Sequence, residues 1–377
     1  CKDLPSGEPE SQGQLKPVTS HGSGRYETST FVETYVMDIP PGLFTTFKEP
    51  EPQYLPPGWS AHVHPEGNIY FALDGPLRVV TNAYLYRGTT LQRVCHWIEQ
   101  IQKLLLQSGV TVTENAELFL MLEAEDCGYY LVDHATRTQF WLESFDTEKL
   151  DLPAVSTQSQ LKIVLEELYW VHVEHFPMHV KPLPTEILDD IIYIFSHGLC
   201  DQMTSHVSTF NFSARECEVF LNLLQRCRGN INSGHTTWII ARLWSILDAH
   251  KVLIHHGQEQ ARLSRDQYIV FNPELKHRWL SLIMALITFK TSGHHLARLN
   301  DVFVDHIVYI HQWKPFISDC LQQWRSTTYV VSNSASTCES AGPTFCRHSQ
   351  DSCAYPLVLR SSSFFTVQPG CTSPSWC

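Results

Sequence analysis

The chain has 377 residues, of which 43% are hydrophobic and 18% are charged. This composition is that of folded globular proteins, so it excludes disorder of the whole chain, and the length allows two or three domains. The formal net charge of −12 argues against a general nucleic-acid surface, because such surfaces need clustered Lys and Arg. We therefore expect no nucleic-acid partner.

The first 50 residues are rich in Pro, Gly, Ser, Thr and Glu and show no sustained periodicity. Segments of this kind cannot bury enough apolar surface to fold by themselves. Residues 1–50 are accordingly predicted to be mostly disordered.

Residues 55–86 have the pattern of a small antiparallel sheet. They open with the sequence LPPGW, which ends at Trp59, and the turn residues Pro65-Glu66-Gly67 precede an apolar strand, Ile69 to Leu73. A three-stranded sheet of about 30 residues has little core of its own. This segment therefore needs burial from elsewhere in the chain.

A helix is predicted next, over residues 89–108. Its apolar residues recur at helical spacing, namely Leu91, Val94, Trp97, Ile98, Ile101, Leu104 and Leu105. Such an apolar stripe must pack against another element, and the nearest candidates are the sheets before and after it. We therefore favour a composite βββ-α-βββ unit over two independent small sheets.

Residues 115–146 form the second predicted sheet, which contains the sequence GYYLVDHATRTQFW from Gly128 to Trp141. Tyr130, Val132 and His134 alternate along one strand and would lie on one face of it. A Thr-rich turn then leads to a strand that ends at Trp141. Tyr130 and Trp141 are thus expected side by side.

Both segments resemble WW domains, the first by its LPPGW opening and the second by its aromatic-His, Thr-rich turn and Trp pattern. The resemblance implies a groove for a proline-rich peptide formed by Tyr130, Val132, His134 and Trp141. It implies structural roles for Leu55, Pro56, Trp59 and Tyr70. Flat aromatic walls capture extended proline segments at small entropic cost. The alternative is that these aromatic residues only form the core of a sheet.

The two segments depart from the WW pattern in opposite ways. The first has Thr81 at the position of the groove Trp, so its groove is predicted to be closed. The second has Phe119 at the position of the structural Trp and Ser144 where a proline is usual. Equal spacing in the two segments also indicates an internal repeat in which Tyr70 corresponds to Tyr130, with a chance match as the alternative.

From Leu150 onward the pattern is helical, and residues 155–325 are predicted to form an α-helical domain. The predicted helices are Ser156–His175, Glu186–Cys200, one that starts at a Ser213–Glu216 capping box and runs to Arg228, Trp238–His256, and two or three between Lys276 and Arg325, with Pro315 as a helix start.

Histidine is abundant, with 20 residues, and the close pairs are His172 with His175, His255 with His256, and His294 with His295. None matches a zinc-protease motif or brings a third ligand at a recognisable spacing, so no metal and no cofactor are predicted. His172 and His175 are predicted to be polar positions on a partly buried helix. No nucleophile elbow, phosphate-binding loop or kinase motif is present, and we expect no enzymatic activity.

The remaining cysteine and membrane signals concern localisation. Cys200, Cys217, Cys227 and Cys320 lie in apolar helical contexts typical of reduced core residues. The longest apolar run, from Trp279 to Phe289, has about eleven residues, and a bilayer needs about 20. Residues 326–377 are rich in Ser and Cys and are predicted to be a disordered tail.

Residues 55 to about 325 resemble an uncharacterised family of WW-domain proteins from mushroom-forming fungi, on the evidence of the segments Gln260–Gln267 and Asp305–Trp313. The resemblance implies a membrane-spanning C-terminus, in place of which this chain has the Ser- and Cys-rich tail. Because the chain also begins with Cys1, we expect that natural termini are missing and leave membrane attachment open. A cytoplasmic protein, or one attached to a membrane and facing the cytoplasm, is expected.

The sequence therefore predicts an α+β protein with small antiparallel WW-like sheets, a mainly α-helical domain and disordered ends. The expected function is protein interaction, with a proline-rich peptide or protein as partner. The alternative is that the sheets are purely structural and that the helical domain is a scaffold, membrane-attached in the full-length protein. Exposure of both Tyr130 and Trp141 would favour peptide binding, and their burial under the helix that contains Leu91 to Leu105 would favour the structural alternative.

Overall fold

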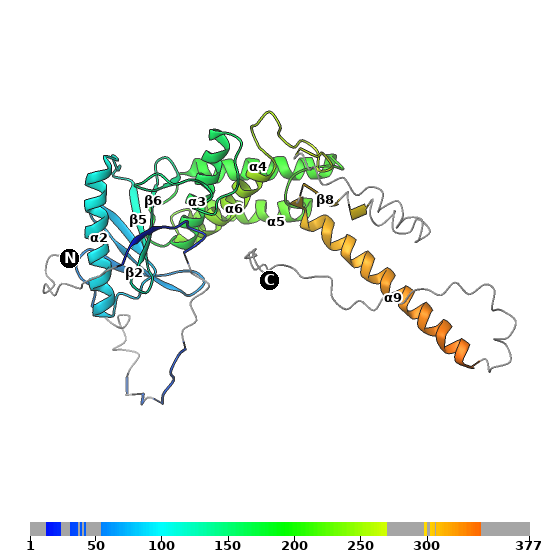
Figure 1. Ribbon diagram of the computed structural model, residues 1–377, viewed down its shortest axis with the longest axis horizontal. Coiled ribbons are helices and arrows are strands. Elements are labelled where there is room, and N and C mark those ends of the chain that lie inside the picture. Colours follow the sequence, from blue (N-terminus) through cyan, green and yellow to red (C-terminus); the bar gives the residue numbers. More distant parts are fainter. Residues whose placement is uncertain are drawn as a thin grey trace. The chain divides into compact units, whose positions relative to one another are not determined.

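The computed structural model describes residues 13–23, 31–36, 38–39, 41–42, 54–269, 298–299, 302–305 and 307–340. The chain divides into two compact units, residues 1–314 and 315–377. The fold is α+β, with a mixed seven-stranded sheet and a set of helices in the first unit (Figure 1). Among the described residues, none of the helices combines the length and the apolar character that crossing a bilayer requires.

The sheet is built from two three-stranded antiparallel halves. The first half is β2 (Trp59–Val63), β3 (Ile69–Leu73) and β4 (Arg78–Thr81); the second is β5 (Ala116–Leu122), β6 (Cys127–Asp133) and β7 (Thr138–Phe140). β4 and β5 pair in parallel and join the halves into one sheet. Helix α2 (Gly88–Ser108) is the crossover that a parallel pair requires. The order βββ-α-βββ is therefore present in a single sheet.

A further strand comes from the segment that the sequence predicted to be disordered. Strand β1 (Leu15–Pro17) pairs in parallel with the beginning of β6, while β7 pairs with the end of the same strand. The prediction of disorder is wrong for these residues, because the edge of β6 supplies the hydrogen-bond partners that the short segment lacks alone. Val18 continues the pairing, since its N–H donates to the Tyr129 carbonyl at 3.1 Å.

The two faces of the sheet belong to two different hydrophobic clusters, because neighbouring strand residues point to opposite sides. Phe71, Val79 and Leu118 pack in the cluster that contains the buried stripe of α2. Tyr70, Val80, Phe119, Tyr130 and Val132 face the other way and share a cluster with helix α3 (Gln158–His175). Figure 1 shows α2 and α3 on opposite sides of the sheet.

The helices that follow are α4 (Thr185–Thr204), α5 (Ala214–Cys227), the short 3-10 helix η1 (Arg228–Asn230) and α6 (Gly234–Leu253). Helix α6 packs on α3, and α5 packs on α4. Trp170 of α3 stacks on Trp244 of α6 with ring centroids 5.7 Å apart. The predicted capping box is confirmed: the Ser213 hydroxyl accepts from the Glu216 N–H, and the Glu216 carboxylate accepts from the Ser213 N–H. A two-stranded sheet of β8 (Phe303–Val304) and β9 (Ile307–Val308) comes later.

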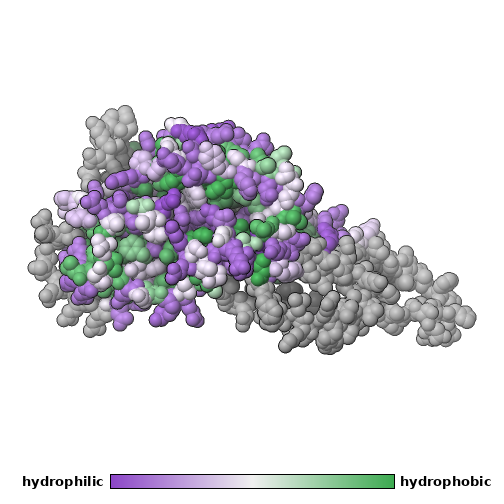
Figure 2. All heavy atoms as spheres, turned by 90° about the horizontal axis from the view of Figure 1, so that it is seen from above, coloured by the Kyte–Doolittle hydropathy of each residue, from purple (hydrophilic) through white to green (hydrophobic). Residues whose placement is uncertain are grey.

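Some predictions for the C-terminal part are corrected. Helix α9 (Ile310–Ser340) begins before Pro315 and contains it, and it extends into the residues predicted to be a disordered tail. Cys217 and Cys227 are buried as expected, whereas Cys200 is exposed. The apolar run Trp279–Phe289 lies outside the described residues. Figure 2 shows one face of the surface, on which hydrophilic and hydrophobic residues are interspersed.

Candidate functional site

The residues predicted to form a peptide groove do not form an open one. Tyr130 and Val132 are both 0% exposed and lie in the cluster shared with α3. The Tyr130 ring stacks on Phe119 with centroids 4.7 Å apart, and its hydroxyl lies 3.1 Å from His172 Nδ1. Helix α3 therefore occupies the side of β6 on which the sequence placed a ligand.

Trp141 is only partly buried, and its partner is the chain's own N-terminal segment. Its indole N–H donates to the Val18 carbonyl at 2.9 Å, and the Gln139 amide donates to the same oxygen at 3.4 Å. In return the Ser20 N–H donates to Gln139 Oε1 at 3.2 Å. An extended stretch with Pro17 next to Val18 thus runs past Trp141.

The residues predicted to be structural in the first half are at least half-buried and face both clusters. Leu55 and Pro56 are half-buried, and the Pro56 carbonyl accepts from the Trp59 N–H at 3.1 Å. Trp59 belongs to the cluster of α2, whereas Tyr70 belongs to that of α3. Thr81 is buried, and its hydroxyl donates to the Leu120 carbonyl at 2.7 Å.

A cluster that the sequence did not group lies between the sheet and α3. Its centre is Glu117 of β5, which is 0% exposed. Glu117 Oε1 lies 3.2 Å from His172 Nε2 and 2.9 Å from His179 Nε2. Glu117 Oε2 lies 3.4 Å from His134 Nε2 and 3.0 Å from Arg78 Nη2. These five residues are called the Glu117 cluster below.

Each histidine of the Glu117 cluster is also held by a tyrosine hydroxyl at its other ring nitrogen. His172 Nδ1 lies 3.1 Å from Tyr130 Oη, and His179 Nδ1 lies 3.1 Å from Tyr70 Oη. His134 Nδ1 lies 3.3 Å from Tyr169 Oη. The two tyrosines at corresponding positions of the predicted repeat, Tyr70 and Tyr130, thus each contact a histidine that lies next to Glu117 Oε1.

The charge states in the Glu117 cluster follow from burial and hydrogen bonding. Burial by itself would raise the pKa of Glu117, but attraction by His179 and hydrogen bonds from three histidines outweigh it and hold the pKa well below its usual range. Burial lowers the pKa of His172 to about 4, although Glu117 opposes this. Burial and the Glu117 charge raise the pKa of Tyr130 well above its usual value. At neutral pH an ionised carboxylate therefore faces the neutral His172 ring.

These charge states fix the direction of the hydrogen bonds. A neutral His172 that contacts a carboxylate must donate through Nε2–H, so its Nδ1 accepts from the Tyr130 hydroxyl. Glu117 then accepts from Arg78 and up to three imidazoles, which matches the acceptor capacity of a carboxylate. The cluster can serve as a hydrogen-bond network around an ionised carboxylate, and its imidazole and carboxylate groups are also ligands for transition metals.

Sequence reasoning missed this cluster because its members come from β4, β5, the end of β6, α3 and the loop after α3. His172 was predicted to be a polar position on a partly buried helix, and in the structure the residue itself is 0% exposed. One signal was present: Glu117 is the single charged residue in the apolar strand Ala116–Leu122. Buried carboxylates require partners, and this one has them.

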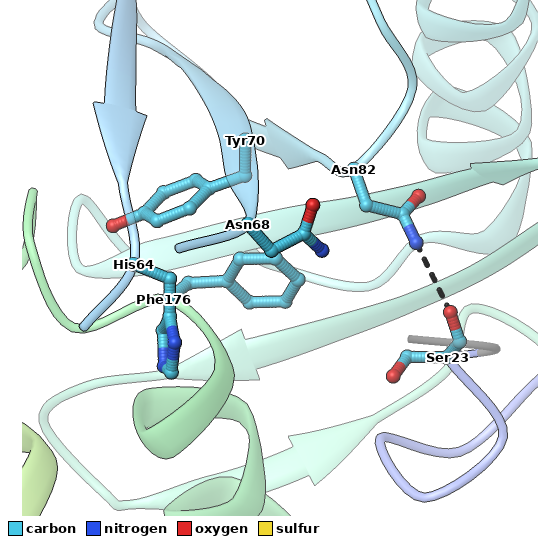
Figure 3. Close-up of a pocket in the computed structure, with 6 residues that line it drawn as sticks. All are labelled: Ser23, His64, Asn68, Tyr70, Asn82 and Phe176. Carbon is cyan, nitrogen blue, oxygen red and sulfur yellow. Dashed lines mark hydrogen bonds between the residues drawn. The ribbon is translucent and has the colours of Figure 1, made fainter. Parts of the chain in front are cut away.

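A small cavity is partly lined by Tyr70, whose hydroxyl contacts His179 of the Glu117 cluster (Figure 3). It is lined by Ser23, His64, Asn68, Tyr70, Asn82 and Phe176, and the Asn82 amide donates to the Ser23 carbonyl at 3.1 Å. Its volume of about 10 Å³ suffices for about one water molecule. It is too small for an organic ligand.

Fold and site together define an α+β protein with a buried carboxylate–histidine cluster between its sheet and its helices. No protein-family model matches the chain, and no significant similarity connects it to a curated protein or to a solved structure.

Proposed function

We propose that this protein is a non-enzymatic interaction scaffold in which both WW-like sheets are structural. The observation that carries the proposal is the complete burial of Tyr130 and Val132 against α3, so that neither side chain is accessible to a ligand. The parallel β4–β5 pairing supports it, because each half of the sheet obtains from the other the burial that a separate small sheet lacks.

The site for an extended segment is then the edge of β6 next to Trp141. Strand addition at a sheet edge uses main-chain hydrogen bonds for affinity and side-chain contacts for specificity. Leu15–Val18 already meets this description, with β pairing to β6 and a carbonyl bonded to the Trp141 indole. A partner that binds in the same way as Leu15–Val18 would be an extended, proline-containing strand. It would compete with Leu15–Val18 for the edge of β6.

The test uses the full chain and a fluorescein-labelled peptide with the sequence of residues 13–23. The variant Val18→Asp places a charge beside Met121 and Gly128, which should displace the chain's own strand and open the edge. We expect the peptide to bind this variant with micromolar to 0.1 mM affinity, on the order expected for so small a contact, and to bind wild type at least tenfold more weakly.

The matched control is the same peptide with Val18→Asp, which should not bind. Adding Trp141→Phe to the protein removes the indole donor and should weaken binding of the natural peptide. If the Val18→Asp protein is folded and does not bind the peptide, the proposal of a binding site at the edge of β6 is overturned. If wild type binds PPxY or polyproline peptides saturably and Trp141→Phe does not, the hypothesis of an aromatic peptide groove is supported. That result would contradict the proposal that both sheets are purely structural.

A further inference from the structure

We propose that Glu117, His134, His172 and His179 bind one divalent transition-metal ion, with zinc as the best match. The proposal is independent of the interaction role above. It rests on the convergence of one carboxylate and three imidazole Nε2 atoms between the sheet and α3.

The distances within the cluster agree with coordination. Ligand atoms of Glu117, His134 and His172 all lie within 4.8 Å of one another. Zinc bonds of about 2.0–2.1 Å place two tetrahedral ligand atoms about 3.3 Å apart. Glu117 Oε1 lies 3.2 Å from His172 Nε2, and the other carboxylate oxygen, Oε2, lies 3.4 Å from His134 Nε2. His179 Nε2 lies 2.9 Å from Glu117 Oε1, and this proximity makes it the residue that we assign to the fourth position.

The tyrosines make the site able to exist with and without an ion. A coordinating imidazole presents a bare Nε2 and donates through Nδ1–H, whereas without an ion Nε2–H donates to Glu117. A tyrosine hydroxyl can accept from Nδ1–H in the first case and donate to Nδ1 in the second. Partners at the second nitrogen orient metal-binding histidines, and all three histidines here have one.

The donor set selects the kind of ion. Three nitrogens and one carboxylate suit Zn²⁺, Co²⁺ and related ions, whereas Mg²⁺ and Ca²⁺ prefer all-oxygen sites. The side chains of His134 and Arg78 are 13% and 18% exposed, so an ion can enter from that side. Arg78 contacts Glu117 Oε2 at 3.0 Å and opposes a cation by its charge. An ion here would tie β5, β6 and α3 together, and its role is structural.

The test is a titration of the full chain with Co²⁺, and then with Zn²⁺, after treatment with a chelator. Tetrahedral Co²⁺ gives visible absorption, and thiolate ligands add a near-ultraviolet charge-transfer band, so the spectrum separates this cluster from the twelve cysteines. We expect one Co²⁺ per chain without the thiolate band, and displacement by Zn²⁺.

The variants His134→Gln and His172→Gln should weaken Co²⁺ binding at least about 100-fold. His197→Gln, an exposed histidine on α4, is the matched control and should bind as wild type does. His134 lies at the rim of the cluster, so its variant remains informative if His172→Gln fails to fold. The proposal is overturned if the folded wild-type protein shows no Co²⁺ absorption typical of nitrogen and oxygen ligands. It is also overturned if His134→Gln binds Co²⁺ as tightly as wild type does. In either case the cluster is a hydrogen-bond network without a metal.

Discussion

Replacing the carboxylate at the centre of the Glu117 cluster should destabilise the first unit of the chain. In Glu117→Gln one oxygen remains, but an amide NH₂ replaces the other and faces N–H donors. Arg78 and His134 can turn to water because their side chains are partly exposed, whereas His172 cannot. An unsatisfied buried donor costs about 1–3 kcal/mol, and breaking a buried ionic network costs about 3–5 kcal/mol. We therefore expect a loss of about 3 kcal/mol.

Urea unfolding followed by circular dichroism at pH 7.5 measures this loss, with chelator present so that no metal contributes. Glu125→Gln is the matched control, because Glu125 is exposed in the turn between β5 and β6, and its change should stay within about 0.5 kcal/mol. A loss below about 1 kcal/mol for Glu117→Gln would refute the view that this carboxylate organises its neighbours.

Three further predictions concern other contacts. Burial lowers the pKa of His250 to about 4, so the folded state resists a proton that the unfolded state accepts near pH 6.5; stability is then lost as the pH falls between these values. About 2 kcal/mol of the stability difference between pH 7.5 and 5 should disappear in His250→Gln, as measured by urea unfolding at both pH values. Gly198→Ala would bring Cβ into a steric clash with the Phe210 ring and should cost about 1–3 kcal/mol, seen as a lower Tm; an unchanged Tm would contradict this packing. If the metal proposal holds, Arg78→Gln should tighten Co²⁺ binding, because it removes a positive charge next to Glu117, and weaker binding would show that Arg78 instead holds the carboxylate in place.

Local chemistry explains which predictions the structure confirms. The helix with the Leu91–Leu105 stripe is present because its apolar spacing is helical whatever it packs against. The Ser213 capping box is present because both of its hydrogen bonds join residues three apart. Pro315 was wrongly taken as a helix start, since α9 begins at Ile310 and contains it, and a proline inside a helix can kink it without ending it.

The sequence by itself determined the α+β class, the βββ-α-βββ order and most helix positions, because periodicity and capping act over a few residues. Only the tertiary structure decided what Tyr130 does. The alternation of Tyr130 with Val132 predicts that both side chains lie on one face of the strand. A ligand groove and a buried core would both produce this alternation, so it does not distinguish them. Helix α3, more than 25 residues further along the chain, covers that face and brings His172 to the Glu117 carboxylate. Contacts between such distant residues leave no spacing in the sequence, so the cluster could be seen only once the chain was folded.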